Sequence, residues 1–167
     1  MSMKALVSNG NRVFISVANR LQAPFLLAVR LYWGWQFWQA GWGKLHRIPQ
    51  VTEFFTSLGI PMPHLNAVCV SSLEVVGGIL LALGLGSRFI SLLLAGDMFV
   101  AYLTAEKDAL HSIFSDPGKF YTADSYTFLF AALMILILGP GLFSLDALLE
   151  KMWGSPKEGE VYQPRTV

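Results

Sequence analysis

The chain has 167 residues, enough for one domain, of which 54% are hydrophobic, 13% aromatic and only 14% charged. Soluble domains carry about 25% charged residues, and the mean hydropathy of this chain is positive at +0.51, so the composition indicates a membrane protein. A net charge of +1 gives no basic surface that would mark a nucleic-acid partner, and a single cysteine, Cys69, excludes an internal disulfide and a thiol-cycling redox pair.

The N-terminal segment, residues 1–23, is polar to amphipathic. Val13, Val17 and Leu21 recur at helical spacing with arginines between them, which predicts a short helix on the cytoplasmic membrane surface. A loosely ordered tail is the alternative. The pattern of a cleaved signal peptide is not visible before the first apolar run, so we expect that run to be retained.

Four apolar segments follow, each about 18 to 21 residues long, which is the length that a helix needs to cross a bilayer core of about 30 Å. They cover residues 24–43, 64–84, 88–105 and 125–142. Strands are a poor alternative because these runs are too long and do not alternate. We therefore predict an all-α fold, a four-helix transmembrane bundle, in a domain that covers residues 24–150 and precedes a flexible cytoplasmic tail over 151–167.

The connections add two structural features and an orientation. The 84–87 link is so short that the second and third helices are expected to form an antiparallel hairpin. Residues 44–63 show one apolar helical face that contains Val51, Phe54 and Leu58, which predicts an amphipathic interfacial segment between the first two helices. Eight lysines and arginines fall on the side of the termini and four on the other, so the positive-inside rule places both termini in the cytoplasm.

Three charged side chains fall inside the predicted spans: Arg30, Glu74 and Asp97. Glu74 is about ten residues from either end of its helix, roughly 15 Å deep at about 1.5 Å per residue, where a lone charge costs roughly 3 kcal/mol. We therefore predict that the three face inward and form one buried cluster, in which one carboxyl group carries a proton at neutral pH. They are the candidate catalytic residues, which would handle protons or a polar headgroup; the alternative is that they only orient helices.

Small residues accompany these buried charges. Gly78 shares a helical face with Glu74, and Gly34 and Gly41 lie on the Arg30 side of the first helix. Because small residues let helix backbones approach closely in lipid, these faces are predicted to be helix–helix contacts.

The first apolar segment is rich in aromatic side chains. Trp33 and Phe37 can pack on a flat ring such as that of a quinone, and Gln36 offers hydrogen bonds beside them. The alternative is a lipid-facing aromatic surface with ordinary packing. Lys44 and Arg88, at opposite membrane interfaces, complete the candidate cofactor-binding residues; their alternatives are contacts with lipid phosphates or simple anchoring of their helices.

The three histidines give no cofactor site. His46, His64 and His111 lie on or near the outer side, and none is in the middle of a span. A haem held by histidines of facing helices is therefore not expected, and no metal-binding spacing such as HExxH occurs. We predict neither haem nor metal; the alternative is that the histidines gather with Glu53, Asp108 or Asp116 to hold a metal at the outer face.

Three segments of the chain share a pattern with a known family: RLYWGWQFWQAGWGKL, FFTSLGIPMP and LEVVGGILLALGLGSRF. Together they resemble the DoxX family of small bacterial four-helix membrane proteins over roughly residues 24–142. The positions that match are Arg30, Lys44, Gly59, Pro61, Glu74, Gly77, Gly78, Gly84 and Arg88. Asp97 lies in no motif that aligns, so its place in the cluster rests on its position in the third apolar segment.

The resemblance implies a multi-pass protein of the bacterial inner membrane, and one branch of the family looks like the membrane subunit of a thiosulfate:quinone oxidoreductase. We predict an integral membrane subunit of a redox complex that binds quinone or links a partner oxidoreductase to the quinone pool. The alternative is a non-catalytic membrane anchor or assembly subunit. The expected partners are membrane lipid and either a redox protein or further copies of the chain. A small transporter is disfavoured because four helices without an inverted repeat leave little room for a gated path.

Overall fold

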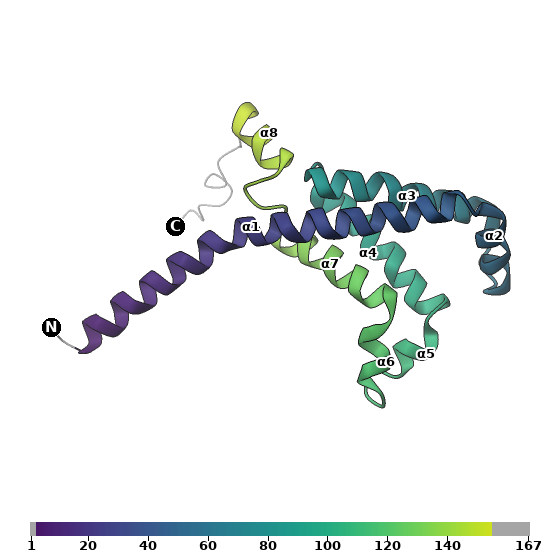
Figure 1. The fold of residues 1–167 in the computed structure, drawn as a ribbon, viewed down its shortest axis with the longest axis horizontal. Coiled ribbons are helices and arrows are strands. Elements are labelled where there is room, and N and C mark those ends of the chain that lie inside the picture. The colour runs from purple at the N-terminus through teal and green to yellow at the C-terminus, as the bar shows by residue number, and fades with distance from the viewer. Residues whose placement is uncertain (1–2, 155–167) are drawn as a thin grey trace, which may run out of the picture.

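The fold is helical throughout the part of the chain that is described. In this computed structural model the backbone is described for residues 3–154 and the side chains for residues 14–154, and no β-strand occurs among them. The predicted all-α fold is confirmed (Figure 1). Most of the predicted tail, residues 155–167, lies outside the described residues, whereas its first three residues end a helix.

Eight helices follow one another in the described chain. They are α1 (Met3–Leu45), α2 (Ile48–Ser57), α3 (Pro63–Leu83), α4 (Ser87–Thr104), α5 (Lys107–His111), α6 (Pro117–Thr122), α7 (Asp124–Leu138) and α8 (Leu145–Trp153). The bundle that was predicted consists of α1, α3, α4 and α7, and α2 is the predicted interfacial segment. The short helices α5, α6 and α8 were not predicted.

Helix α1 joins the predicted surface helix and the first apolar segment into one element. Its 43 residues correspond to about 64 Å at a rise of about 1.5 Å per residue, and its N-terminal part extends beyond the bundle in a different direction (Figure 1). Pro24 lies inside it. A proline removes one intrahelical hydrogen bond and clashes with the preceding turn, so Pro24 is the residue expected to bend this helix.

The apolar helices differ in how well they satisfy the length and hydropathy of a membrane span. Among the described residues α3 and α4 are long and apolar enough to cross a membrane by these two measures. Helix α7 has 15 residues, or about 22 Å, and ends earlier than predicted because Gly139 and Gly141 have positive φ angles on either side of Pro140. Helix α1 is long enough, but its tryptophans, tyrosine and glutamines lower its mean hydropathy compared with α3 and α4.

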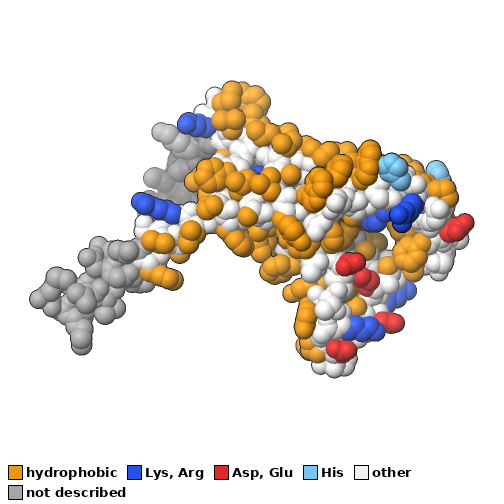
Figure 2. Space-filling model, in the orientation of Figure 1, with side chains coloured by type: hydrophobic (Ala, Val, Ile, Leu, Met, Phe, Trp, Pro, Cys, Tyr) orange, Lys and Arg blue, Asp and Glu red, His pale blue; other side chains and the backbone are white. Residues whose placement is uncertain are grey.

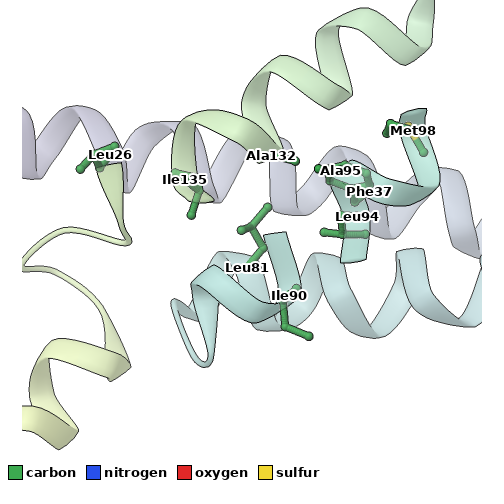
Figure 3. Packing of buried hydrophobic residues seen from close by; sticks show 9 residues of the cluster. All are labelled: Leu26, Phe37, Leu81, Ile90, Leu94, Ala95, Met98, Ala132 and Ile135. Carbon is green, nitrogen blue, oxygen red and sulfur yellow. The ribbon is translucent and has the colours of Figure 1, made fainter. Parts of the chain in front are cut away.

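The bundle consists of two helix pairs, α1 with α3 and α4 with α7, which are joined by the α3–α4 hairpin. A cluster of buried apolar side chains lies between the pairs (Figure 3). Its members are Leu26, Phe37, Leu81, Ile90, Leu94, Ala95, Met98, Ala132 and Ile135. The α4–α7 pair diverges from the α1–α3 pair toward the end that carries α2, α5 and α6 (Figure 1).

Glycines set the distance between α1 and α3. A Cβ atom at Gly34 would lie 2.7 Å from the Gly78 carbonyl oxygen and 2.8 Å from the Ala82 Cβ. A Cβ at Gly41 would lie 2.6 Å from the Ser71 carbonyl oxygen. Later residues of α1 therefore meet earlier residues of α3, which makes the pair antiparallel with the backbones in contact.

The hairpin end of the bundle is closed by α8. Gly84 and Gly86 turn the chain with positive φ angles, and the carboxylate of Asp146 in α8 accepts hydrogen bonds from the Gly86 amide at 2.7 Å and the Ser87 amide at 2.9 Å. A carboxylate at this position satisfies free amide groups at the start of α4 and is favoured by the helix dipole. The start of α4 and the start of α8 are thereby held together.

The outer surface of the bundle is strongly apolar. Large side chains that are half exposed or more occur on all four helices of the bundle, among them Leu31, Val76, Phe99 and Ile137. Figure 2 shows this apolar surface, with most of the visible charged side chains toward its two ends. Apolar patches of this extent mark contact with membrane or protein, and they agree with a bundle that faces lipid.

Replacing Gly34 by alanine is expected to destabilise the protein by about 1–3 kcal/mol, which is the usual cost of overpacking a filled interface. The added Cβ would meet backbone atoms of α3, which cannot move away as a flexible side chain can. Thermal and chemical unfolding of the purified protein in detergent measures the loss.

The matched control for this experiment is Gly43→Ala. It lies in the same helix, but no atom lies within 4 Å of its added Cβ, so we expect equal or slightly higher stability from the better helix propensity of alanine. Equal effects of the two substitutions would show that α1 and α3 do not pack as described.

Candidate functional site

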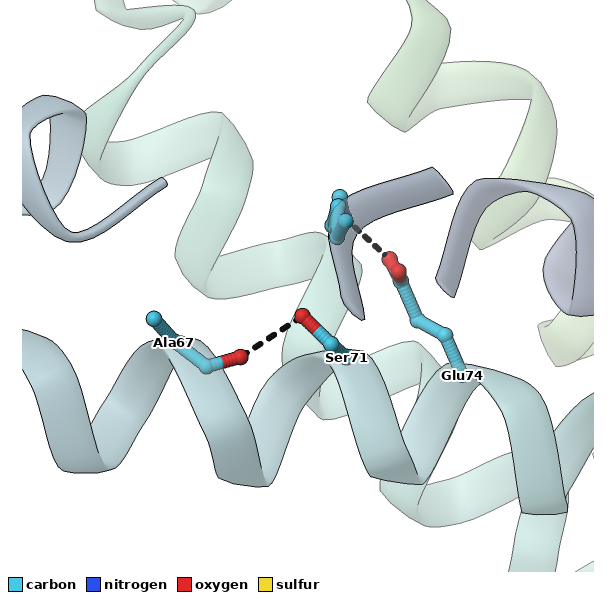
Figure 4. A network of polar contacts seen from close by, with 4 residues as sticks. Ala67, Ser71 and Glu74 are labelled. Carbon is cyan, nitrogen blue, oxygen red and sulfur yellow. Dashed lines mark hydrogen bonds and ion pairs between the residues drawn. The ribbon is translucent and has the colours of Figure 1, made fainter. Parts of the chain in front are cut away.

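A buried ion pair joins α1 to the middle of α3. The Nζ atom of Lys44, in the last turn of α1, lies 2.5 Å from Oε1 of Glu74. The Glu74 side chain is 1% exposed, whereas that of Lys44 is 35% exposed. In Figure 4 the Glu74 side chain points away from its own helix toward the neighbouring one. Glu74 is therefore shielded from solvent, whereas Lys44 remains partly accessible from outside the bundle.

The glycine contact between the helices explains why these two side chains meet. Gly41 faces Ser71 and Glu74 so closely that a Cβ on it would lie 2.7 Å from the Glu74 Cβ. Lys44 follows Gly41 by three residues, and helical side chains lean toward the N-terminus of their helix, so its ammonium returns to the level of Glu74. The Ser71 hydroxyl donates instead to the Ala67 carbonyl at 2.6 Å (Figure 4).

Asp97 adds a second carboxyl group to this site. It lies in α4, is half buried, and Glu74 and Lys44 are both near enough to act on it electrostatically. Its Oδ2 atom and Oε2 of Glu74 are buried without a hydrogen-bond partner among the described residues. A second carboxyl group thus lies near the ion pair without forming an ion pair of its own among the described residues, and one buried oxygen of each carboxyl group has no partner there.

Arg30 does not belong to this group, so the predicted three-residue cluster is wrong in its cation. Arg30 and Lys44 are fourteen residues apart in α1, about 21 Å. Arg30 is fully buried at the hairpin end, donates a hydrogen bond to the Phe143 carbonyl, and occupies the space beside Gly84. Its Nε and Nη1 atoms have no partner among the described residues.

The prediction was wrong because it used depth in the membrane and not helix register, although the sequence contains the register. The prediction compared depths in the membrane and ended the first helix at residue 43, whereas α1 continues to Leu45 and includes Lys44. The register of the helices is set by the small residues, which are seven apart in both α1 (34 and 41) and α3 (71 and 78). Matching these spacings in antiparallel order places the backbone of Arg30 level with Ala82 and that of Lys44 level with Val68. Because helical side chains lean toward the N-terminus of their helix, the side chain of Arg30 reaches Gly84 and those of Lys44 and Glu74 meet near the level of Ser71.

The predicted aromatic residues contact protein. Phe37 is fully buried and its ring packs against Phe128 of α7 with a centroid distance of 4.7 Å; Trp33 contacts the same ring at 5.2 Å. The Gln36 side chain donates to the Tyr32 hydroxyl at 3.0 Å. These are packing contacts within the protein, and they place the rings of Trp33 and Phe37 between α1 and α7.

Arg88, the last predicted ligand residue, lies at the hairpin end in the first turn of α4. It is exposed, and its guanidinium lies beside Gly139 at the end of α7. The predicted site residues therefore fall in three places: the Lys44 site, the rings around Phe128, and the hairpin end. No group of three potential metal ligands occurs in the part of the chain that was searched.

Residues 25–107 match the family model described as DoxX. The chain belongs to the DoxX family. The matched range contains Lys44, Glu74 and Asp97, as well as Arg30 and Arg88. Both the ion pair and the second carboxyl group therefore lie within the DoxX domain.

Two relatives cover most of the chain. The "Inner membrane protein YqjF" of Escherichia coli (strain K12) is 29% identical over 136 residues, which are 80% of this chain and 98% of the relative. The "Putative oxidoreductase CatD" of Bacillus subtilis (strain 168) is 26% identical over 125 residues, which are 75% of this chain and 87% of the relative. No solved structure matches the chain. The family and YqjF support a location in the inner membrane.

A double-mutant cycle measures the contribution of the ion pair. Lys44→Met leaves Glu74 buried without its cation, and we expect a loss of about 3 kcal/mol, at the lower end for a broken buried pair because Lys44 is partly exposed. Glu74→Leu added to Lys44→Met is expected to restore most of it. A coupling of about 1–3 kcal/mol in unfolding experiments is the predicted result.

Arg47→Met is the control for this cycle, because Arg47 is exposed just beyond Lys44. It should leave stability unchanged and show no coupling to Glu74→Leu. A coupling near zero between Lys44 and Glu74 would contradict the described pair.

Proposed function

We propose that this DoxX protein is the integral membrane subunit of a redox complex, which binds a quinone headgroup at Lys44, Glu74 and Asp97 and links a partner oxidoreductase to the quinone pool. The distribution of lysine and arginine supports an orientation with both termini in the cytoplasm. In this orientation the site lies toward the outer half of the membrane, since Lys44 is at the opposite end of α1 from the N-terminus.

One observation carries the proposal: the Lys44–Glu74 ion pair lies inside the bundle near the carboxyl group of Asp97, and one buried oxygen of each carboxyl group has no partner among the described residues. Burial without a partner costs free energy, so these atoms are suited to a ligand that donates or accepts a hydrogen bond. Lys44, which is partly exposed, gives such a ligand a direct contact with the site.

The chemistry of quinones fits this group of side chains. Reduction of a quinone to a quinol consumes two electrons and two protons, and in this proposal the electrons come from the partner oxidoreductase. The chain itself would therefore supply hydrogen bonds and protons. A protonated carboxyl of Glu74 or Asp97 can donate its proton to a carbonyl oxygen, and the Lys44 ammonium can donate a hydrogen bond to that oxygen and stabilise negative charge on it.

The comparisons support the redox part of the proposal only in outline. The name of CatD describes that relative as an oxidoreductase, whereas the name of YqjF describes a membrane location. Both relatives align over most of this chain. The quinone is inferred from the side chains at the site.

The second candidate function is a membrane anchor or assembly subunit in which the buried charges are structural. The observation in its favour is the position of the Glu74 pair beside Gly41, at one of the close backbone contacts of α1 with α3. In this alternative the pair would fix the register of the helices, a role that buried polar groups have in some bundles.

The test is binding of a short-chain quinone to purified protein in lipid nanodiscs, read as quenching of tryptophan fluorescence, together with quinone-linked turnover of membranes. Glu74→Gln and Asp97→Asn keep the size of each side chain. We expect each to weaken quinone binding at least about tenfold, or roughly 1.4 kcal/mol, and to lower turnover while the protein still folds.

The controls are Glu53→Gln and Asp108→Asn, which make the same chemical changes at exposed positions of α2 and α5. They should bind quinone as the unmodified protein does. Unchanged quinone affinity in both site variants would overturn the proposal. Unchanged affinity together with loss of a co-purifying partner would favour the anchor function.

A further inference from the structure

A second polar site lies at the hairpin end, far from Lys44. A groove of about 840 Å³ runs between α1, the start of α4, the α7–α8 link and α8. Its volume is within the range of about 300–1,000 Å³ that is usual for ligand sites. Its lining includes Arg88, Ser87 and Glu150 as well as large apolar side chains.

Three polar side chains of the groove, Arg88, Ser87 and Glu150, have no hydrogen-bond or ion-pair partner among the described residues. The only ion pair among the described residues is that of Lys44 with Glu74, so Arg88 and Glu150 are not paired there. The Ser87 hydroxyl is fully buried and has no hydrogen-bond partner in the same part of the chain. Asp146 differs from these groups because both of its carboxylate oxygens accept backbone amides. A guanidinium, a hydroxyl and a carboxylate therefore remain for a ligand.

The apolar side chains continue from the groove to the lipid-facing surface. Phe89 is 66% exposed, and Leu142 and Trp153 are each 79% exposed. Ile137 of α7 is also exposed. Figure 2 shows apolar side chains at the α8 end of the molecule. Tryptophan at the edge of such a surface is typical of the headgroup level of a membrane.

We propose that this groove binds a zwitterionic glycerophospholipid whose headgroup carries a phosphate and a primary ammonium. The phosphate contacts the Arg88 guanidinium, which suits it geometrically, and the Ser87 hydroxyl. The ammonium contacts Glu150. The acyl chains lie along Phe89 and Leu142.

The charges of the groove favour this class over an anionic lipid. Arg88 is the single lysine or arginine in the lining, and two carboxylates, Asp146 and Glu150, accompany it. An anionic headgroup would gain one cation and meet the repulsion of Glu150. A zwitterionic headgroup with an ammonium satisfies Arg88 and Glu150 at once, and a quaternary choline headgroup would have no N–H to donate to Glu150.

Native mass spectrometry of the purified full-length protein, titrated with lipids in detergent, tests the proposal. The probes are phosphatidylethanolamine, phosphatidylglycerol and phosphatidylcholine with identical acyl chains. We expect one site that prefers phosphatidylethanolamine over each of the others at least about fivefold, or roughly 1 kcal/mol. Arg88→Gln should weaken binding of all three lipids.

Glu150→Gln tests the ammonium contact separately from the phosphate contact. Glu150 lies at an exposed position, so this variant should fold normally. It is expected to abolish the preference for phosphatidylethanolamine over phosphatidylglycerol while a lipid still binds. Arg47→Gln and Glu53→Gln, at exposed positions near α2, are the controls and should change nothing.

Three results would overturn the proposal. The first is a preference for phosphatidylglycerol that Glu150→Gln does not change. The second is lipid binding that is equal in Arg88→Gln and Arg47→Gln. The third is binding that occurs only after residues 155–167 are deleted, which would show that these residues of the chain occupy the groove.

Discussion

The close contact between α1 and α3 determines the arrangement of the rest of the structure. In lipid there is little hydrophobic gain from helix association, so close packing and polar contacts stabilise a bundle instead. Gly34 and Gly41 provide the close packing, because they leave no side chain between the two backbones. The same contact fixes an antiparallel register, and this register brings Lys44 to Glu74.

The two ends of the bundle differ in how their charges are used. At the hairpin end Arg30 is fully buried and bonded to the Phe143 carbonyl, and Asp146 joins α8 to the start of α4. At the other end the helix pairs diverge (Figure 1), and Lys44 is partly exposed beside two carboxyl groups. Contacts between α1, α4, α8 and the α7–α8 link hold the first end together, whereas the second holds the ion pair with an unpartnered oxygen on each of two carboxyl groups.

The sequence was sufficient to predict the two helices of the hairpin. The predicted spans 64–84 and 88–105 agree with α3 and α4 within one residue at each end, because hydropathy and the short hairpin act locally. The end of α7 was misjudged because the apolar residues continue beyond Gly139, where the backbone leaves the helix. The partner of Glu74 was also misjudged, since depth in a membrane does not define helix register. The spacing of small residues in α1 and α3 contains this register, but it becomes evident only when the two helices are aligned.

The most direct test of this account is a solid-state NMR measurement of the dipolar coupling between ¹⁵N at Lys44 Nζ and ¹³C at Glu74 Cδ, in protein reconstituted in bilayers. The account predicts a strong coupling, as for two groups in direct contact, and none between Glu74 and the guanidinium of Arg30. A coupling of Glu74 to Arg30, or an uncoupled Lys44, would contradict the register of α1 on α3 and the site that depends on it.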